Sequence, residues 1–136
     1  VWYMEHNEQS PVYRSDLIAI SPKGQASPLT PYVDVVSADV KTLYALLSAA
    51  SWQLRQAAHL ELLRRGGPAL EPAIQRLQSR GADPHSSDAH TVTHWSYLAA
   101  ASRSAESGRA LQALVRHSDS QVRQHVIRAL GEITCL

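Results

Sequence analysis

An internal repeat restricts the fold of this chain more than any other feature of its sequence. Residues 51–56 (Ser-Trp-Gln-Leu-Arg-Gln) align with residues 119–124 (Asp-Ser-Gln-Val-Arg-Gln), 68 residues later. The apolar positions stay in register, so that Leu54, Ala58 and Leu62 align with Val122, Val126 and Leu130. Since this spacing is twice a period of about 34, it leaves room for one further helical hairpin between the two copies. Repeats of this kind bury their apolar faces on one another, which predicts a stacked helical array.

Residues 37–136 have the hydrophobic periodicity of helices throughout. The pattern predicts helices after Ser37, after Ser51 up to Gly66-Gly67, from Pro68 to Gly81, over about 88–102, over about 107–116 and after Asp119. The residues expected to face the core are Val40, Leu43, Leu47, Leu54, Ala58, Leu62, Leu70, Ile74, Leu77, Val92, Trp95, Leu98, Leu111, Leu114, Val122, Val126, Leu130 and Ile133. Trp52 is also expected to pack between hairpins. Short turns between these helices predict an all-α fold of three helical hairpins.

Residues 1–36 have a different composition. They hold four of the seven prolines, at Pro11, Pro22, Pro28 and Pro31. Residues 1–4 and 16–21 are predicted to be short strands, and the second ends at a Pro-Lys-Gly turn signal. Residues 25–36 are typical of a linker. We therefore place a boundary near residue 37, between an irregular segment with short strands (1–36) and the helical part (37–136).

Charge and cysteine content exclude several classes of function. Thirteen Lys and Arg against twelve Asp and Glu leave a net charge of +1, too small to drive binding to nucleic acid. The one cysteine, Cys135, can form neither an internal disulfide nor a CxxC metal site. The uncharged stretch 42–54 is far shorter than a membrane-spanning helix. We expect neither a nucleic-acid partner nor a membrane span.

The second repeat copy resembles the second helix of HEAT-like repeats, which opens with a capping Asp, continues with Val-Arg and ends in Leu-Gly. The matching residues are Asp119, Val122, Arg123, Ala129, Leu130 and Gly131, and in the first copy Leu54, Arg55, Ala58 and Leu62, with Ser51 in place of Asp. Around residues 88–92 the middle repeat lacks the Val-Arg pair. The resemblance covers about residues 38–134 and implies a HEAT-like α-solenoid. Independently of the resemblance, Asp119 is expected to cap its helix, and Arg123, one turn further on, is placed so that it can pair with Asp119 or with a neighbouring repeat.

A second resemblance concerns the N-terminal strings Val1-Trp2-Tyr3 and Asp16 to Gly24. They look like the closing strands of a sugar-dehydrogenase-like β-propeller. In one group of large secreted proteins such a propeller precedes HEAT-like repeats and a cytochrome c domain, and residues 93–98 are similar to a His-plus-aromatic helix of those repeats. This resemblance implies a fragment of a quinoprotein-like dehydrogenase that is periplasmic or secreted.

Histidines provide the candidate metal site. His85, His90 and His94 lie close together in sequence beside Asp88. On one helix His90 and His94, four residues apart, could ligate zinc or copper, with His85 or Asp88 as a third ligand. The alternative is that His90 is exposed near a helix start and that His94 packs with Trp95 or its neighbours. We favour the alternative.

The sequence contains no phosphate-binding glycine loop, GxSxG or HExxH motif, and no paired carboxylates at helical spacing. Arg64, Arg65, Arg80 and Arg116 are expected at helix ends, where they interact with the helix dipole. No active site is visible, and no cofactor is expected within the chain. The expected function is a non-catalytic scaffold or protein-interaction module, whose partner is another protein or a neighbouring domain of the same polypeptide. The alternative is the helical portion of the larger dehydrogenase, with its chemistry outside this chain.

Overall fold

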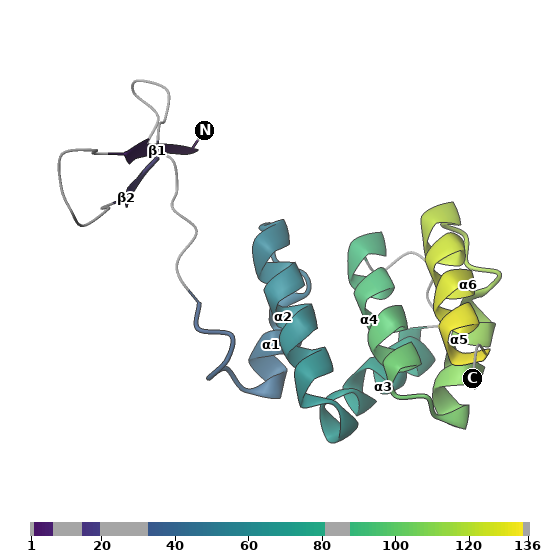
Figure 1. The fold of residues 1–136 in the computed structure, drawn as a ribbon. Helices are drawn as coiled ribbons and strands as arrows, with labels where there is room; N and C mark the ends of the chain where they lie inside the picture. The colour runs from purple at the N-terminus through teal and green to yellow at the C-terminus, as the bar shows by residue number, and fades with distance from the viewer. Residues whose placement is uncertain (1, 7–14, 20–32, 81–87, 135–136) are drawn as a thin grey trace. The chain divides into compact units, whose positions relative to one another are not determined.

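The computed structural model describes residues 2–6, 15–19, 33–80 and 88–134 (Figure 1). The chain divides into two units, Val1–Tyr32 and Val33–Leu136. In the first unit, β1 (Trp2–His6) pairs antiparallel with β2 (Ser15–Ala19), with Trp2 opposite Ala19. The second unit is all-helical over its described residues, which confirms the predicted helical class.

The helices of the second unit begin and end close to the predicted signals. They are α1 (Val40–Leu46), α2 (Trp52–Arg65), the short 3-10 helix η1 (Gly67–Ala69), α3 (Glu71–Arg80), α4 (Ala89–Ala101), α5 (Ala105–Leu114) and α6 (Ser120–Thr134). Within the described ranges, none of these helices combines the length and apolar character that crossing a membrane requires.

Local capping explains where predicted and observed boundaries differ. α1 begins after Asp39 rather than Ser37, because the Asp39 carboxylate accepts the Thr42 amide at 2.7 Å. α5 begins earlier than predicted, because Ser104 accepts the Ser107 amide at 3.0 Å and so becomes the N-cap. Pro68 lies in η1 and not in α3, since the chain forms a separate 3-10 turn after Gly66.

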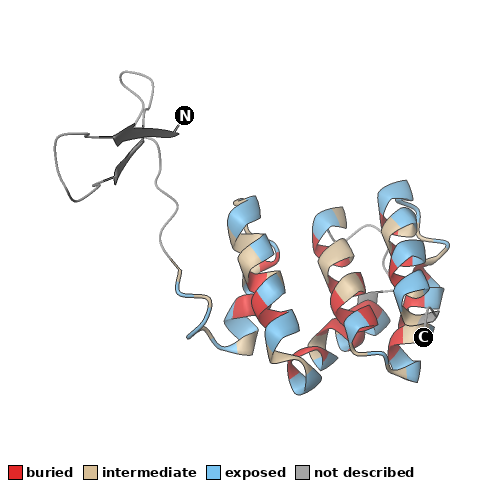
Figure 2. Ribbon diagram, viewed as in Figure 1, coloured by how far each residue is buried: buried red, intermediate tan, exposed pale blue. Residues whose placement is uncertain are grey.

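Consecutive helices pack as the pairs α1–α2, α3–α4 and α5–α6, and α4 also contacts both α2 and α6. Figure 1 shows α2, α4 and α6 side by side, with α4 in the middle. The buried residues follow the contact faces of these helices (Figure 2), and the largest fully buried apolar side chains are Leu43, Leu47, Leu62, Leu98, Leu111, Val122 and Val126. The second helices of the pairs therefore form one layer.

Most predicted core positions are buried, and the exceptions lie near helix ends. Val40, Leu54, Leu130 and Ile133 are only half-buried. On α6 the buried stripe runs through Val122, Val126 and Ala129, all at most 1% exposed. Val122 and Val126 thus follow the predicted stripe, whereas Ala129 is fully buried and Leu130 and Ile133 only pack against the edge of the core.

The sequence repeat is also a repeat of hydrogen bonds. Arg55 Nη1 donates to the carbonyls of Ala49 and Ala50, at 2.7 and 2.9 Å. Arg123 Nη1 donates to the carbonyls 68 positions further on, those of His117 and Ser118, both at 2.7 Å. Each arginine supplies donors to carbonyls in the turn before its own helix. The prediction that Arg123 can pair with Asp119 or a neighbouring repeat did not include these carbonyl contacts.

Asp119 does act as a cap. Its Oδ1 accepts the amides of Gln121 at 2.7 Å and Val122 at 3.3 Å. At the aligned position Ser51 bonds the Gln53 side chain at 2.8 Å and makes no side-chain cap bond. The two repeat copies therefore share the arginine contact but not the cap.

A buried carboxylate holds the start of the helical unit against α2. Glu61 is 5% exposed and pairs with Arg64 at 2.6 Å and with Arg65 at 2.8 Å. Arg65 also donates to the carbonyl of Val36 at 2.9 Å. Hydrogen bonds from Arg64 and then Arg65 hold the pKa of Glu61 well below its usual range, at about 2. These arginines lie in the last turn of α2, as predicted.

Candidate functional site

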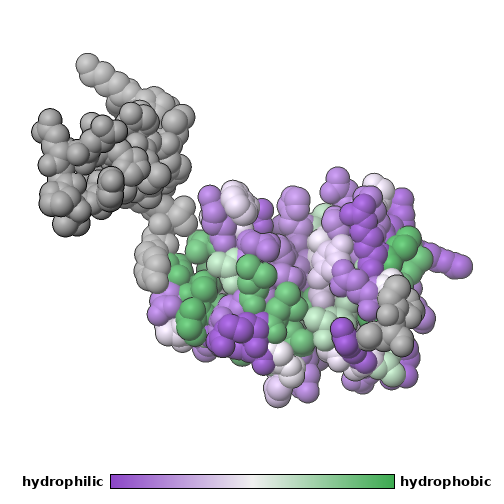
Figure 3. Space-filling view, viewed as in Figure 1, coloured by the Kyte–Doolittle hydropathy of each residue, from purple (hydrophilic) through white to green (hydrophobic). Residues whose placement is uncertain are grey.

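α2 carries a stripe of exposed apolar side chains. Trp52 is 64% exposed, Leu60 54% and Leu63 37%. Their spacing of eight and eleven residues places them on one side of the helix. In Figure 3, hydrophobic surface gathers over the α1–α2 part of the helical unit, next to hydrophilic side chains. The prediction that Trp52 packs between hairpins is wrong, because this side of α2 faces solvent; Trp95, by contrast, is buried.

Two histidines meet where α2 lies next to α4. His59 Nδ1 of α2 lies 3.2 Å from His94 Nδ1 of α4, and the ring centroids are 5.0 Å apart with the planes tilted by 51°. Both residues are half-buried. Burial, together with the nearby His94, lowers the pKa of His59 to about 4. Burial also lowers the pKa of His94, helped by Arg55. Both imidazoles are therefore neutral at neutral pH.

A second histidine contact lies between α4 and α6. The Tyr97 hydroxyl of α4 is 3.2 Å from His125 Nδ1 of α6. The two rings meet edge to face, with centroids 5.9 Å apart and an angle of 75°. Each junction within the α2–α4–α6 layer is thus bridged by a polar pair that contains histidine.

The structure describes only part of the candidate metal cluster His85, His90 and His94. His90 is exposed, and Asp88 caps α4 by accepting the His90 amide at 3.3 Å. His85 lies outside the described residues. Within the parts of the chain that the structure describes, no group of three or more His, Cys, Asp or Glu is placed to hold a metal ion. His94 meets His59, which lies 35 residues earlier and had no place in the sequence argument.

Two depressions lie beside Leu63 and Ala101. One has a volume of about 650 Å³ and is lined by His59, Leu63, Tyr97, Ala100, Ala101, Arg103 and Glu132. Arg103 has a φ of +52°, in the left-handed region that non-glycine residues seldom occupy. The lining of this depression therefore includes one residue from each histidine contact, His59 and Tyr97, together with the strained Arg103 and the carboxylate of Glu132.

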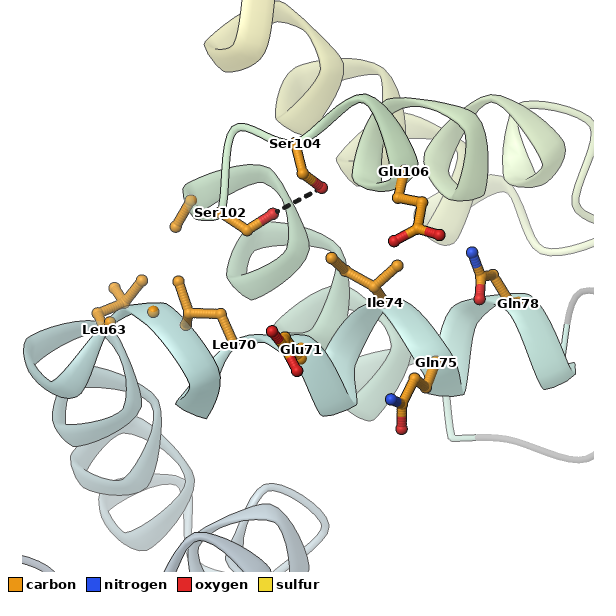
Figure 4. A pocket seen from close by; sticks show the side chains of 12 residues that line it. Leu63, Leu70, Glu71, Ile74, Gln75, Gln78, Ser102, Ser104 and Glu106 are labelled. Atoms are coloured by element: carbon orange, nitrogen blue, oxygen red, sulfur yellow. Dashed lines mark hydrogen bonds between the residues drawn. The ribbon is translucent and has the colours of Figure 1, made fainter.

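The other depression, of about 690 Å³, lies between α3 and the loop after α4. Figure 4 shows Leu63, Leu70 and Ile74 along its apolar side and Glu71, Gln78 and Glu106 at its edges. Ser102 Oγ donates to Ser104 Oγ at 3.3 Å on its far side. The acidic and amide groups make this depression more polar than the α2 stripe.

Arg76 is packed within the helical unit instead of forming part of a basic surface patch. Its guanidinium lies 4.8 Å from the ring centre of Tyr44 and 5.7 Å from that of Trp95. Burial raises the pKa of Tyr44 to about 12, and its hydroxyl donates to the Ala69 carbonyl at 3.0 Å. This group ties α1, α3 and α4 together.

Comparison with known proteins adds no assignment, because no family model, curated protein or solved structure matches the chain.

Proposed function

We propose that the chain is a non-catalytic helical-repeat module whose α2–α4–α6 face binds another protein or a neighbouring domain of the same polypeptide. The observation that carries this proposal is the exposed stripe of Trp52, Leu60 and Leu63 on α2. Exposed apolar side chains that gather on one side mark interaction surfaces, and tryptophan is enriched among the residues that dominate binding energy.

The repeated arginine contacts support a HEAT-like solenoid as the architecture behind this face. Arg55 and Arg123 make the same pair of bonds at positions 68 residues apart. α4 lies between α2 and α6, so the three second helices offer one extended surface. In such an array each hairpin adds a strip to the binding face.

The proposal is tested with a double variant, Trp52→Ser with Leu60→Ser. The matched control is Val36→Ser, because Val36 is 64% exposed but precedes α1 and lies on none of the helices α2, α4 and α6. The wild type, the double variant and the control are each cross-linked in an extract of the organism that produces the protein. A partner that the wild type retains is then purified, and its binding to all three proteins is measured by calorimetric titration.

We expect the control to bind the purified partner like the wild type, and the double variant to bind at least about tenfold more weakly. Circular dichroism checks that all three proteins are folded. Equal affinity of the double variant and the wild type would refute the α2 stripe as the binding surface.

A second candidate is the helical portion of a larger sugar-dehydrogenase-like protein with a haem domain. Its support is the antiparallel pairing of β1 (Trp2–His6) with β2 (Ser15–Ala19), which overlap the strings Val1 to Tyr3 and Asp16 to Gly24 that resemble propeller strands. The test is the intact mass of the natural polypeptide. A mass near 14.9 kDa would exclude this candidate, whereas a far larger one with a propeller and a haem domain would support it.

A further inference from the structure

The contact between His59 and His94 has the separation of two ligands on one metal ion. Their Nδ1 atoms are 3.2 Å apart. Zinc binds histidine nitrogens at about 2.0–2.1 Å in tetrahedral geometry, which places two such nitrogens roughly 3.3–3.4 Å from each other. The observed separation lies within about 0.2 Å of this value.

The orientation of the rings agrees with the separation of the nitrogens. The centroids are 5.0 Å apart, closer than two imidazoles placed end to end about a straight N–H···N bond of this length. In at least one ring, the axis from the ring centre through Nδ1 therefore does not point straight at the other Nδ1 atom. A cation shared by both rings must also lie off that line.

The charges around the pair are mixed. The positive charge of Arg55 and the ring of His90 act against a cation near His94, and Asp88 acts in its favour. The Arg55 guanidinium also donates to the carbonyls of Ala49 and Ala50, at 2.7 and 2.9 Å. Burial keeps both imidazoles in the neutral form that binds metals.

We propose that His59 and His94 form a two-histidine site for a divalent transition metal, with Zn²⁺ as its natural occupant. Imidazole nitrogens suit zinc, copper and nickel, and tetrahedral geometry favours zinc. Among the described residues no third His, Cys, Asp or Glu joins this pair, and water can fill the remaining positions. The ion links α2 to α4 and thus joins the first hairpin to the second.

One rival site shares a ligand with this pair. His90 and His94 lie four residues apart on α4, a spacing at which two histidines also bind zinc. His90 is exposed, whereas His59 is half-buried against α4. Replacing His59 and His90 separately distinguishes the two sites.

The experiment is calorimetric titration of the full chain, free of any affinity tag, with zinc chloride at neutral pH. The variants are His59→Gln and His94→Gln, with His90→Gln as the matched control, and circular dichroism checks their folding. We expect one zinc per chain for the wild type and for His90→Gln, with affinity at least about tenfold weaker for the other two. Absence of saturable binding to the wild type, or loss of binding only in His90→Gln and His94→Gln, would overturn the proposal.

A measurement on the wild type keeps the test independent of how well the variants fold. The ring resonances of the histidines are followed by NMR during the same titration. We expect those of His59 and His94 to shift together and to saturate at one equivalent of zinc. Shifts confined to other histidines would refute the site.

Discussion

Replacing Val126 with alanine tests the packing of α6 against its neighbours. Val126 is fully buried in the helical unit. The change removes two carbon groups, at about 0.8 kcal/mol each for transfer from water, and leaves a cavity that costs more. We expect the free energy of unfolding to fall by about 2–3 kcal/mol. For a domain of this size, that lowers the melting temperature by roughly 10 °C.

Two other residues of the same helix serve as comparisons. Leu130 is half-buried, so Leu130→Ala should cost about 1–2 kcal/mol although it removes more atoms. Ile127 is 56% exposed, and Ile127→Ala should change stability by about 0.5 kcal/mol or less. The assay is urea denaturation followed by circular dichroism. A cost for Ile127→Ala equal to that for Val126→Ala would refute the orientation of α6.

The remaining predictions concern polar contacts. Arg55→Ala and Arg123→Ala should each lower the free energy of unfolding by about 1–3 kcal/mol, because each arginine donates to two carbonyls. The two losses should add in the double variant. Urea denaturation measures these losses, and unequal values for the two single variants would contradict the structural equivalence of the repeats. The lowered pKa of Glu61, about 2 against an ordinary 4.5, means that its ion pairs contribute fully above about pH 4.5 and are lost as the pH falls towards 2. In Glu61→Gln the free energy of unfolding should therefore fall less steeply with decreasing pH than in the wild type. Parallel curves for the two proteins would contradict the assignment of this pH dependence to the ion pairs of Glu61. Tyr97→Phe should cost about 0.5–1.5 kcal/mol through its bond to His125, and a melting temperature unchanged from wild type would argue against that bond.

Helix boundaries were predictable where the signals are local. The segment 88–102 was predicted from its apolar spacing, and α4 occupies Ala89–Ala101 between the caps Asp88 and Ser102. Asp119 caps α6 through amides two and three residues away. A cap and its amides lie within one turn of chain, so nearby residues are enough to place it.

The composition of the contact faces was less predictable. Helical spacing shows which residues share one side, but the angle at which two helices cross decides which part of that side is buried. Ala129 is fully buried in place of Leu130, and Trp52 faces solvent. The size and hydrophobicity of Leu130 and Trp52 predict that both are buried. Residue type alone carries no information about the neighbouring helix, so this prediction failed.

The sequence by itself determined the all-helical class of the second unit, the positions of its helices and the 68-residue equivalence of Arg55 and Arg123. Periodicity and capping act over a few residues, and the repeat places like side chains at like positions. Only the tertiary structure brought His59 to His94 and Tyr97 to His125. These contacts join helices whose relative rotation and offset depend on the packing of the whole core, and no short segment of sequence encodes that arrangement.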